Sequence, residues 1–365
     1  MTNFATTTLP VLDQIGHIFR GDPDSPFLAP RGICLTGEKL LVADTGQNRL
    51  FIWNELPTTE HASPDVVLGQ VSTHDTGRNA GGNASASTLH YPSGIWSDGR
   101  RLIVGDAWNH RVLIWLEFPT SHGQPADVVL GQPDFESVQP NVVGLAKPPT
   151  AKSLNWPYGV WSNGEQLWIG DTGNRRVLFF DRIPTQSDTP ADLVIGQENL
   201  QSRDYEPMNA IWPYSVKIGP RGEMAIADTQ YYRILLWRNW RSALRQPADV
   251  IIGQADFLHN GQNQFRFQPE ANTLNWCYDS FFDEAGIWVV DTGNSRLLHF
   301  PDLPQDHNQA ANSVVGKPDF QTGSENVNTQ FGTENSLYWP FSMSLHQHIL
   351  GIADTGNHRV ILRNL

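Results

Sequence analysis

The sequence predicts an all-β protein in which six four-stranded blades form one closed β-propeller. Six short segments each carry an Asp followed by an Arg five residues later, with little change between copies. The six aspartates are Asp44, Asp106, Asp171, Asp228, Asp291 and Asp354, which are 62, 65, 57, 63 and 63 residues apart. Apolar runs flank every segment, and further strand patterns recur before and after it. Four strands per unit at a period of this kind are typical of propeller blades.

Each repeat is centred on a predicted β-hairpin. In the third copy, the apolar run 167–169 precedes Asp171 and the apolar run 177–180 follows Arg176. Asp and Asn side chains bond to main-chain amides in tight turns, and we expect Gly173 to supply a positive φ there. A residue type that recurs in every blade serves the blade, so we assign the repeated Asp and Arg to structure rather than to a site.

The remaining strands and the ring closure are also predicted. An inner strand precedes each hairpin, as at 94–96 and 159–161, and an outer strand follows it, as at 65–70 and 127–132. The chain ends just after the third strand of its last blade, at 360–362. Residues 11–16 carry the outer-strand pattern, so we expect them to complete that blade and leave no unpaired strand at the seam. Residues 1–365 would then be a single domain.

The segment Asp-x-x-Asn-x-Arg-Val after an apolar strand resembles the NHL repeat. The stretch Ala-Asp-Val-Val-Leu-Gly-Gln-Pro-Asp-Phe at 126–135 is similar to a bacterial subset of NHL-like proteins. The resemblance covers nearly the whole chain and implies a six-bladed propeller. NHL-like propellers include peptide-amidating lyases, RNA- and protein-binding modules and sensor domains, so the resemblance leaves function open. The lyases hold a metal with several channel histidines, and no such set can be placed at the inner-strand starts here, so no metal site is predicted.

Charge and composition argue against some partners. The chain has 25 basic and 38 acidic residues and a net charge of −13, a poor match for nucleic acid or anionic lipid. No stretch approaches the roughly 18 apolar residues of a membrane helix. The two cysteines, Cys34 and Cys277, form no disulfide framework, and the first ten residues lack a signal-peptide pattern. We therefore expect a cytoplasmic protein.

The predicted site is the mouth of the central channel. Long loops such as 133–155 each end in a recurring segment just before the inner strand, as in Asn-Trp-Pro-Tyr-Gly at 155–159, which we call the mouth motif. The residue after the proline position is expected to point toward the axis and contact ligand. The six residues at this position are Arg31, Ser93, Tyr158, Tyr214, Tyr278 and Phe341. The tryptophan before the proline position recurs in four blades (Trp156, Trp212, Trp276, Trp339), so we expect it to pack between blades.

The fifth blade departs most from the repeat. Cys277 replaces the proline and Asp279 replaces the Gly or Ser of the other mouth motifs. We expect Cys277 to be a buried, inert small residue, with a nucleophile or a soft-metal ligand as the alternative. Asp279 is either a buried acid that caps a loop amide or a ligand-binding or catalytic carboxylate.

Three functions stay open at this point. The favoured hypothesis is a binding module that recognises a small molecule or protein segment at the aromatic mouth, where Arg31 can fix an anion. The second is a hydrolase or lyase that uses Asp279, Cys277 or a channel metal. The third is a protein-docking scaffold. The sequence identifies neither the ligand, nor a cofactor, nor the oligomeric state.

Overall fold

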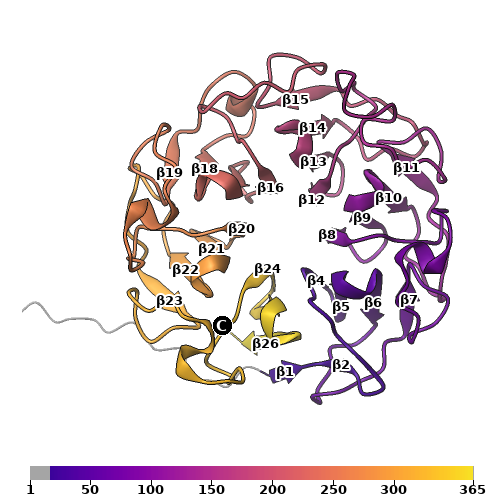
Figure 1. Ribbon diagram of the computed structural model, residues 1–365, viewed down its shortest axis with the longest axis horizontal. Helices are drawn as coiled ribbons and strands as arrows, with labels where there is room; N and C mark the ends of the chain where they lie inside the picture. The colour runs from indigo at the N-terminus through magenta and orange to yellow at the C-terminus, as the bar shows by residue number, and fades with distance from the viewer. Residues whose placement is uncertain (1–16, 365) are drawn as a thin grey trace, which may run out of the picture.

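The computed structural model describes residues 17–364 and arranges six blades around a central channel (Figure 1). Every blade is a four-stranded antiparallel sheet, so the predicted six-bladed β-propeller is confirmed. The first three blades, from inner to outer strand, are β4 Gly32–Thr36, β5 Lys39–Asp44, β6 Arg49–Trp53, β7 Val66–Leu68; β8 Pro92–Ser97, β9 Leu102–Asp106, β10 Arg111–Trp115, β11 Val128–Leu130; and β12 Pro157–Ser162, β13 Leu167–Asp171, β14 Arg176–Phe180, β15 Leu193–Ile195. The last three are β16 Pro213–Ile218, β17 Met224–Asp228, β18 Arg233–Trp237, β19 Val250–Ile252; β20 Cys277–Phe282, β21 Ile287–Asp291, β22 Arg296–Phe300, β23 Ser313–Val315; and β24 Pro340–His346, β25 Ile349–Asp354, β26 Arg359–Asn364, β1 His17–Phe19.

The two ends of the described chain close the ring. Strand β1 pairs antiparallel with β26, with His17 opposite Leu362 and Phe19 opposite Val360, and so supplies the fourth strand of the last blade. The predicted closing strand, 11–16, lies outside the described residues, and the strand directly after it occupies the expected place. A small hairpin of β2 Gly21–Asp22 and β3 Ser25–Pro26 then leads into the first blade.

The apolar core lies between the blades. Each hydrophobic cluster combines sheet faces of two neighbouring blades, as where Leu41 and Leu50 of the first blade pack with Val104 and Leu113 of the second. These four side chains are fully buried. Blade-to-blade packing therefore holds the inner strands at fixed positions around the channel. In the described part of the chain, no helix has the length and apolar character needed to cross a membrane.

The hairpin turns differ from the predicted ones. Each turn is a three-residue 3-10 helix: η1 Thr45–Gln47, η3 Ala107–Asn109, η4 Thr172–Asn174, η5 Thr229–Tyr231, η8 Thr292–Asn294 and η10 Thr355–Asn357. The positive φ falls on the residue after the turn, such as Arg175 with φ 56°, and not on the glycine. Gly173 is needed for a different reason, because a Cβ there would lie 2.3 Å from Nδ2 of Asn155 in the mouth motif.

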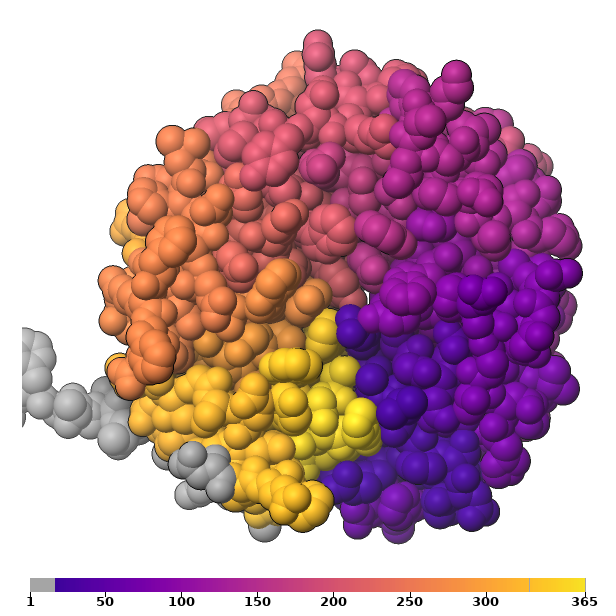
Figure 2. Space-filling model, viewed as in Figure 1, coloured from indigo at the N-terminus to yellow at the C-terminus, as the bar shows by residue number. Residues whose placement is uncertain are grey.

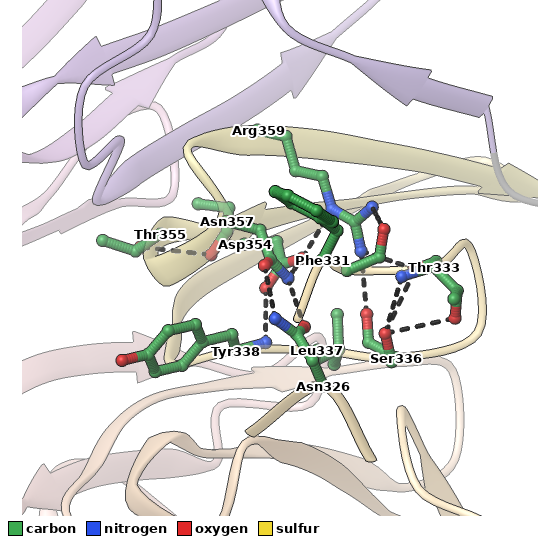
Figure 3. A network of polar contacts seen from close by, with 12 residues as sticks. Asn326, Phe331, Thr333, Ser336, Leu337, Tyr338, Asp354, Thr355, Asn357 and Arg359 are labelled. Carbon is green, nitrogen blue, oxygen red and sulfur yellow. Dashed lines mark hydrogen bonds and ion pairs between the residues drawn. The ribbon is translucent and has the colours of Figure 1, made fainter. Parts of the chain in front are cut away.

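The repeated Asp and Arg form a fully buried ion pair in every blade. Arg176 Nε donates to Asp171 Oδ2 at 2.7 Å, and its Nη2 donates to the carbonyls of Thr150 and Ser153 in the preceding long loop. Figure 3 shows the same arrangement in the last blade around Asp354 and Arg359. The pair therefore ties the hairpin to the long loop, which confirms its structural assignment.

The long loops are pinned to the hairpin turns as well. Asn141 and Asn174 exchange side-chain hydrogen bonds of 3.0 and 2.7 Å, and Asn326 and Asn357 do the same (Figure 3). The other 3-10 turns of the described chain are η2 Arg78–Gly81, η6 Ser242–Leu244, η7 Gln262–Phe265 and η9 Glu325–Asn328. These contacts hold the loops on the face of the ring that carries the hairpin turns.

Candidate functional site

The repeated aspartate also positions the mouth motif. The second carboxylate oxygen of Asp171 accepts the backbone N–H of Asn155 at 2.7 Å, and Asp354 accepts that of Tyr338 at 2.8 Å (Figure 3). In most blades a turn threonine then links to the next blade, as where the Thr172 hydroxyl donates to the Pro213 carbonyl at 2.7 Å. A buried, repeated network thus fixes the six mouth motifs around the channel axis.

All six predicted mouth residues meet at the channel. Arg31, Ser93, Tyr158, Tyr214, Tyr278 and Phe341, which we call the inner ring, line one cavity together with Asp279. Tyr158 stacks on Tyr214 with 4.6 Å between ring centroids, and Tyr278 stacks on Phe341 at 4.2 Å. Tyr214 contacts Tyr278 edge-on at 4.5 Å, so the aromatic members form a continuous layer.

Arg31 completes this layer from the opposite side. Its guanidinium carbon lies 3.9 Å from the Phe341 ring centroid and 5.0 Å from that of Tyr91. A guanidinium stacked on aromatic faces keeps its N–H edges available for an anion. Among residues 17–364, no carboxylate forms an ion pair with Arg31.

The inner ring fills the channel mouth. The cavity it encloses has a volume of about 30 Å³, and Figure 2 shows side chains filling the centre of the ring down to a narrow gap. A volume of this size accommodates one or two water molecules. An organic ligand therefore has no room inside the channel in this conformation. The protein surface that such a ligand can reach is the face above the inner ring.

That face carries a second set of aromatic residues. Tyr91, Trp108, Trp156, Trp212, Trp276 and Trp339, which we call the outer ring, are all partly exposed. Trp108, Trp276 and Trp339 are 45%, 43% and 45% exposed. The predicted packing between blades is present in part, because Trp276 contacts Tyr232 of the preceding blade at 5.3 Å between ring centroids while much of its surface stays in solvent. Trp156 and Trp212 do contact each other across two blades, at 5.9 Å between centroids, but both keep part of their surface in solvent.

The backbone of the outer ring adopts a conformation that bulky residues avoid. Tyr91, Trp156, Trp276 and Trp339 have φ values of 59°, 53°, 49° and 48°. This left-handed region costs a non-glycine residue roughly 1–3 kcal/mol and persists where the surroundings enforce it. The preceding blade does so here, since Trp156 N–H donates to His110 Nδ1 at 3.1 Å. Burial lowers the pKa of His110 to about 4, which keeps its imidazole a neutral acceptor.

Asp279 and Lys217 lie beneath the inner ring. Lys217 Nζ is 3.4 Å from Asp279 Oδ1, and both residues line the cavity. Burial raises the pKa of Asp279, and the nearby Lys217 ammonium opposes that rise. Cys277 does not share the cavity: it is fully buried, and its thiol donates to the Arg233 carbonyl at 3.3 Å. Burial raises the pKa of the Cys277 thiol well above its usual value, which leaves it neutral.

The sequence analysis did not identify Trp108 or Lys217, although both depart from the repeat. Trp108 stands where four of the other five blades carry a turn glycine, stacks on Tyr91 at 4.4 Å between ring centroids and donates from Nε1 to the Tyr158 hydroxyl at 3.2 Å. Lys217 is a charged residue where neighbouring inner strands carry Trp161 or Phe281. In both positions the departure from the repeat is the signal that could have identified them. In the described residues no group of three or more His, Cys, Asp or Glu side chains is arranged to hold a metal ion.

Comparisons with known proteins support the fold alone. No protein-family model and no curated protein matches the chain, so the NHL-like resemblance remains a prediction. Among solved structures, an auxiliary nutrient binding protein from Bacteroides thetaiotaomicron is similar over 95% of this chain and 75% of that one, with 11% identity and a TM-score of 0.54. A streptogramin B lyase covers 96% and 98% of the two chains at 11% identity and a TM-score of 0.48. A hydrazine synthase from Kuenenia stuttgartiensis covers 93% and 96% at 10% identity and a TM-score of 0.49.

Proposed function

We propose that this propeller is a binding module whose ligand, a small molecule or a protein segment, docks on the outer ring above the filled channel mouth. The outer ring itself carries this proposal: six large aromatic side chains share one face and stay partly in solvent. Exposed aromatic groups that are rigidly held offer large contact area at low entropic cost, as binding surfaces require.

The backbone strain supports the same conclusion. Glycine adopts a positive φ freely, so it would be the most stable choice at the positions of Tyr91, Trp156, Trp276 and Trp339. Strained bulky residues are concentrated at functional sites, where a stability cost is tolerated.

One observation favours a second function, catalysis at the channel. Asp279 is a buried carboxyl with a raised pKa beside Lys217, and carboxyls perturbed in this way cluster at active sites. A substrate would first have to displace the inner ring, because the cavity of about 30 Å³ is too small for it. We therefore place the binding module first.

The test uses N-acetyltryptophan amide, a small neutral probe that offers an aromatic side chain and peptide groups. Ligand-observed NMR should show binding with a dissociation constant of roughly 1 mM, typical of such a small contact. The double variant Trp276→Gly/Trp339→Gly should lose that binding, while Phe267→Ala, a fully exposed loop residue outside the ring, should keep it. Absence of binding to the native protein, or equal binding by the double variant, would contradict the proposal.

A further inference from the structure

We propose that the cavity beneath the inner ring is an anion site, built to receive the carboxylate group of a ligand docked on the outer ring. The inference rests on the proposed function, since it names the chemical class of the same ligand. The site consists of two cations, Arg31 and Lys217, one acid, Asp279, and a set of buried hydroxyls.

The charges of the cavity lining do not balance. Lys217 pairs with Asp279 at 3.4 Å, while Arg31 pairs with no carboxylate among residues 17–364. The lining therefore carries one excess positive charge when Asp279 is ionised and more when it is protonated. Arg31 is only partly exposed to solvent. A partly buried cation without a counter-charge loses some of its hydration, and a bound anion offsets that loss.

Two hydroxyls of the lining also lack partners. The side-chain oxygens of Ser93 and Ser342 are buried and make no hydrogen bond to the described residues. The Tyr214 hydroxyl interacts with the Arg31 side chain, and the Ser215 hydroxyl interacts with the Asp279 carboxylate. Buried polar atoms without partners are rare in folded proteins and indicate a missing solvent or ligand molecule. The two unpartnered O–H donors and the two cations form a donor set suited to a carboxylate.

The cavity lies where one position of the repeat changes from glycine in three blades to a polar residue in the other three. At the position after the inner ring, three neighbouring blades carry Gly32, Gly94 and Gly159, and the other three carry Ser215, Asp279 and Ser342. A Cβ at Gly94 would lie 2.5 Å from the Tyr158 carbonyl oxygen, so the glycine half is backbone only. Polar side chains therefore project from one half of the channel toward a backbone wall on the other. The resulting cavity of about 30 Å³ matches a carboxylate group rather than a whole ligand.

Asp279 makes the site sensitive to pH. Burial raises its pKa, so the folded protein holds a proton on Asp279 at pH values where an exposed aspartate has lost it. Anion affinity should thus be high at low pH and fall as the pH rises through that raised pKa. On β16, Lys217 and Ser215 face the carboxyl, and on β24 the Met343 N–H does, 3.4 Å from Oδ2. The acids that end the adjacent hairpin strands, Asp228 and Asp291, are already paired with arginines.

The direct test titrates the protein with formate, which is a carboxylate and little else. Binding would be followed by NMR of ¹³C-formate, with ionic strength held constant by sulfate, a dianion too large for the cavity. Arg31→Met should weaken formate binding by roughly tenfold to a hundredfold, because a charge-assisted hydrogen bond is lost. Arg31→Lys should restore part of it.

Asp279→Asn should change formate affinity in the opposite direction from Arg31→Met. Removal of the competing negative charge should tighten formate binding at alkaline pH and abolish its pH dependence. Lys217→Met leaves Asp279 buried without its cation. If the Lys217→Met protein therefore fails to fold, the double variant Lys217→Met/Asp279→Asn takes its place in the titration. Formate that does not bind, or binds equally to Arg31→Met, would show that the cavity holds water only and would overturn the inference.

A second comparison separates this inference from the proposed function. N-acetyltryptophan and its amide share one body and differ in a carboxylate, so the acid should bind about tenfold more tightly or better to the native protein. That preference should disappear in Arg31→Met and persist in Phe267→Ala. If both probes bind equally, the binding face stands and the anion site fails. If formate binds but neither tryptophan probe does, the cavity binds a free small anion. The proposed function then fails, and so does the inference that the anion belongs to a ligand docked on the outer ring.

Discussion

The hairpin network and the mouth of the channel are built from the same repeat, but they use it in opposite ways. In the hairpins, Asp and Arg recur in all six blades, and every pair is fully buried. At the mouth, the residue after the proline position changes from Arg31 to Ser93 to tyrosine, and these side chains converge on one cavity. Sixfold repetition thus marks what each blade needs to fold, whereas the inner ring varies from blade to blade around a cavity that occurs once per molecule.

The two regions also differ in strain. The hairpin network satisfies its buried groups, since each arginine donates to one carboxylate and to loop carbonyls. The mouth leaves hydroxyls without partners and holds Trp276 and Trp339 at positive φ. The buried Asp–Arg pairs are therefore fully partnered, whereas the mouth combines unpartnered hydroxyls with strained backbone, as expected of a rigid scaffold with a binding site.

The strongest way to break the hairpin network is Asp171→Ala. It leaves Arg176 buried without a counter-charge and frees the Asn155 N–H, so we expect the free energy of unfolding to fall by about 3–5 kcal/mol. Urea unfolding measures this loss. Lys152→Ala is the matched control, because its ion pair with Asp188 is exposed and is worth under ~1 kcal/mol. Equal losses in both variants would refute the structural role of the buried pair.

The hydrogen bond between blades should contribute less to the free energy of unfolding than the buried ion pair. Thr172→Val removes the buried hydroxyl that donates to the Pro213 carbonyl at 2.7 Å and should cost roughly 1–3 kcal/mol, because the carbonyl loses its partner. Thr172→Ser keeps the hydroxyl and should lose less. A comparison of the two unfolding midpoints decides the point, and a serine variant as unstable as the valine variant would assign the threonine to packing instead.

At the mouth, the expected stability change is near zero. Trp276→Gly relieves the strain of a positive φ but loses the contact with Tyr232, whose ring centroid lies 5.3 Å away. Because these two effects oppose each other, the free energy of unfolding should stay within about 1 kcal/mol of the native value. Trp168→Ala, in a fully buried position, should lose about 3–5 kcal/mol. A Trp276→Gly protein as unstable as Trp168→Ala would return the motif tryptophans to a structural role.

The two cysteine thiols are expected to be unreactive in the native protein. Burial raises the pKa of Cys34 to about 11 and that of Cys277 well above its usual value, and the thiolate is the reactive form. Iodoacetamide should therefore leave the native protein unmodified at neutral pH and alkylate both cysteines in urea, as intact mass measures. Rapid alkylation of Cys277 in the native protein would revive it as a nucleophile.

The fold and the inner ring could be predicted because both follow from periodic signals. Apolar runs at fixed distances from Asp171 and its counterparts specify strands, and the proline position specifies which residue faces the axis. The exposure of Trp276 could not be predicted, since it depends on a left-handed backbone that no residue type indicates. The pairing of Lys217 with Asp279 depends on the closure of two blades against each other, and no local pattern contains that distance.

The most direct test compares the two regions within one sample. Tryptophan residues replaced by 5-fluorotryptophan report by ¹⁹F NMR on the outer ring and on buried positions such as Trp115 and Trp168 at once. On titration with N-acetyltryptophan amide, the signals of Trp108, Trp276 and Trp339 should shift while those of the buried tryptophans stay in place. Shifts confined to the buried tryptophans, or none at all, would contradict the division between a buried scaffold and an exposed binding face.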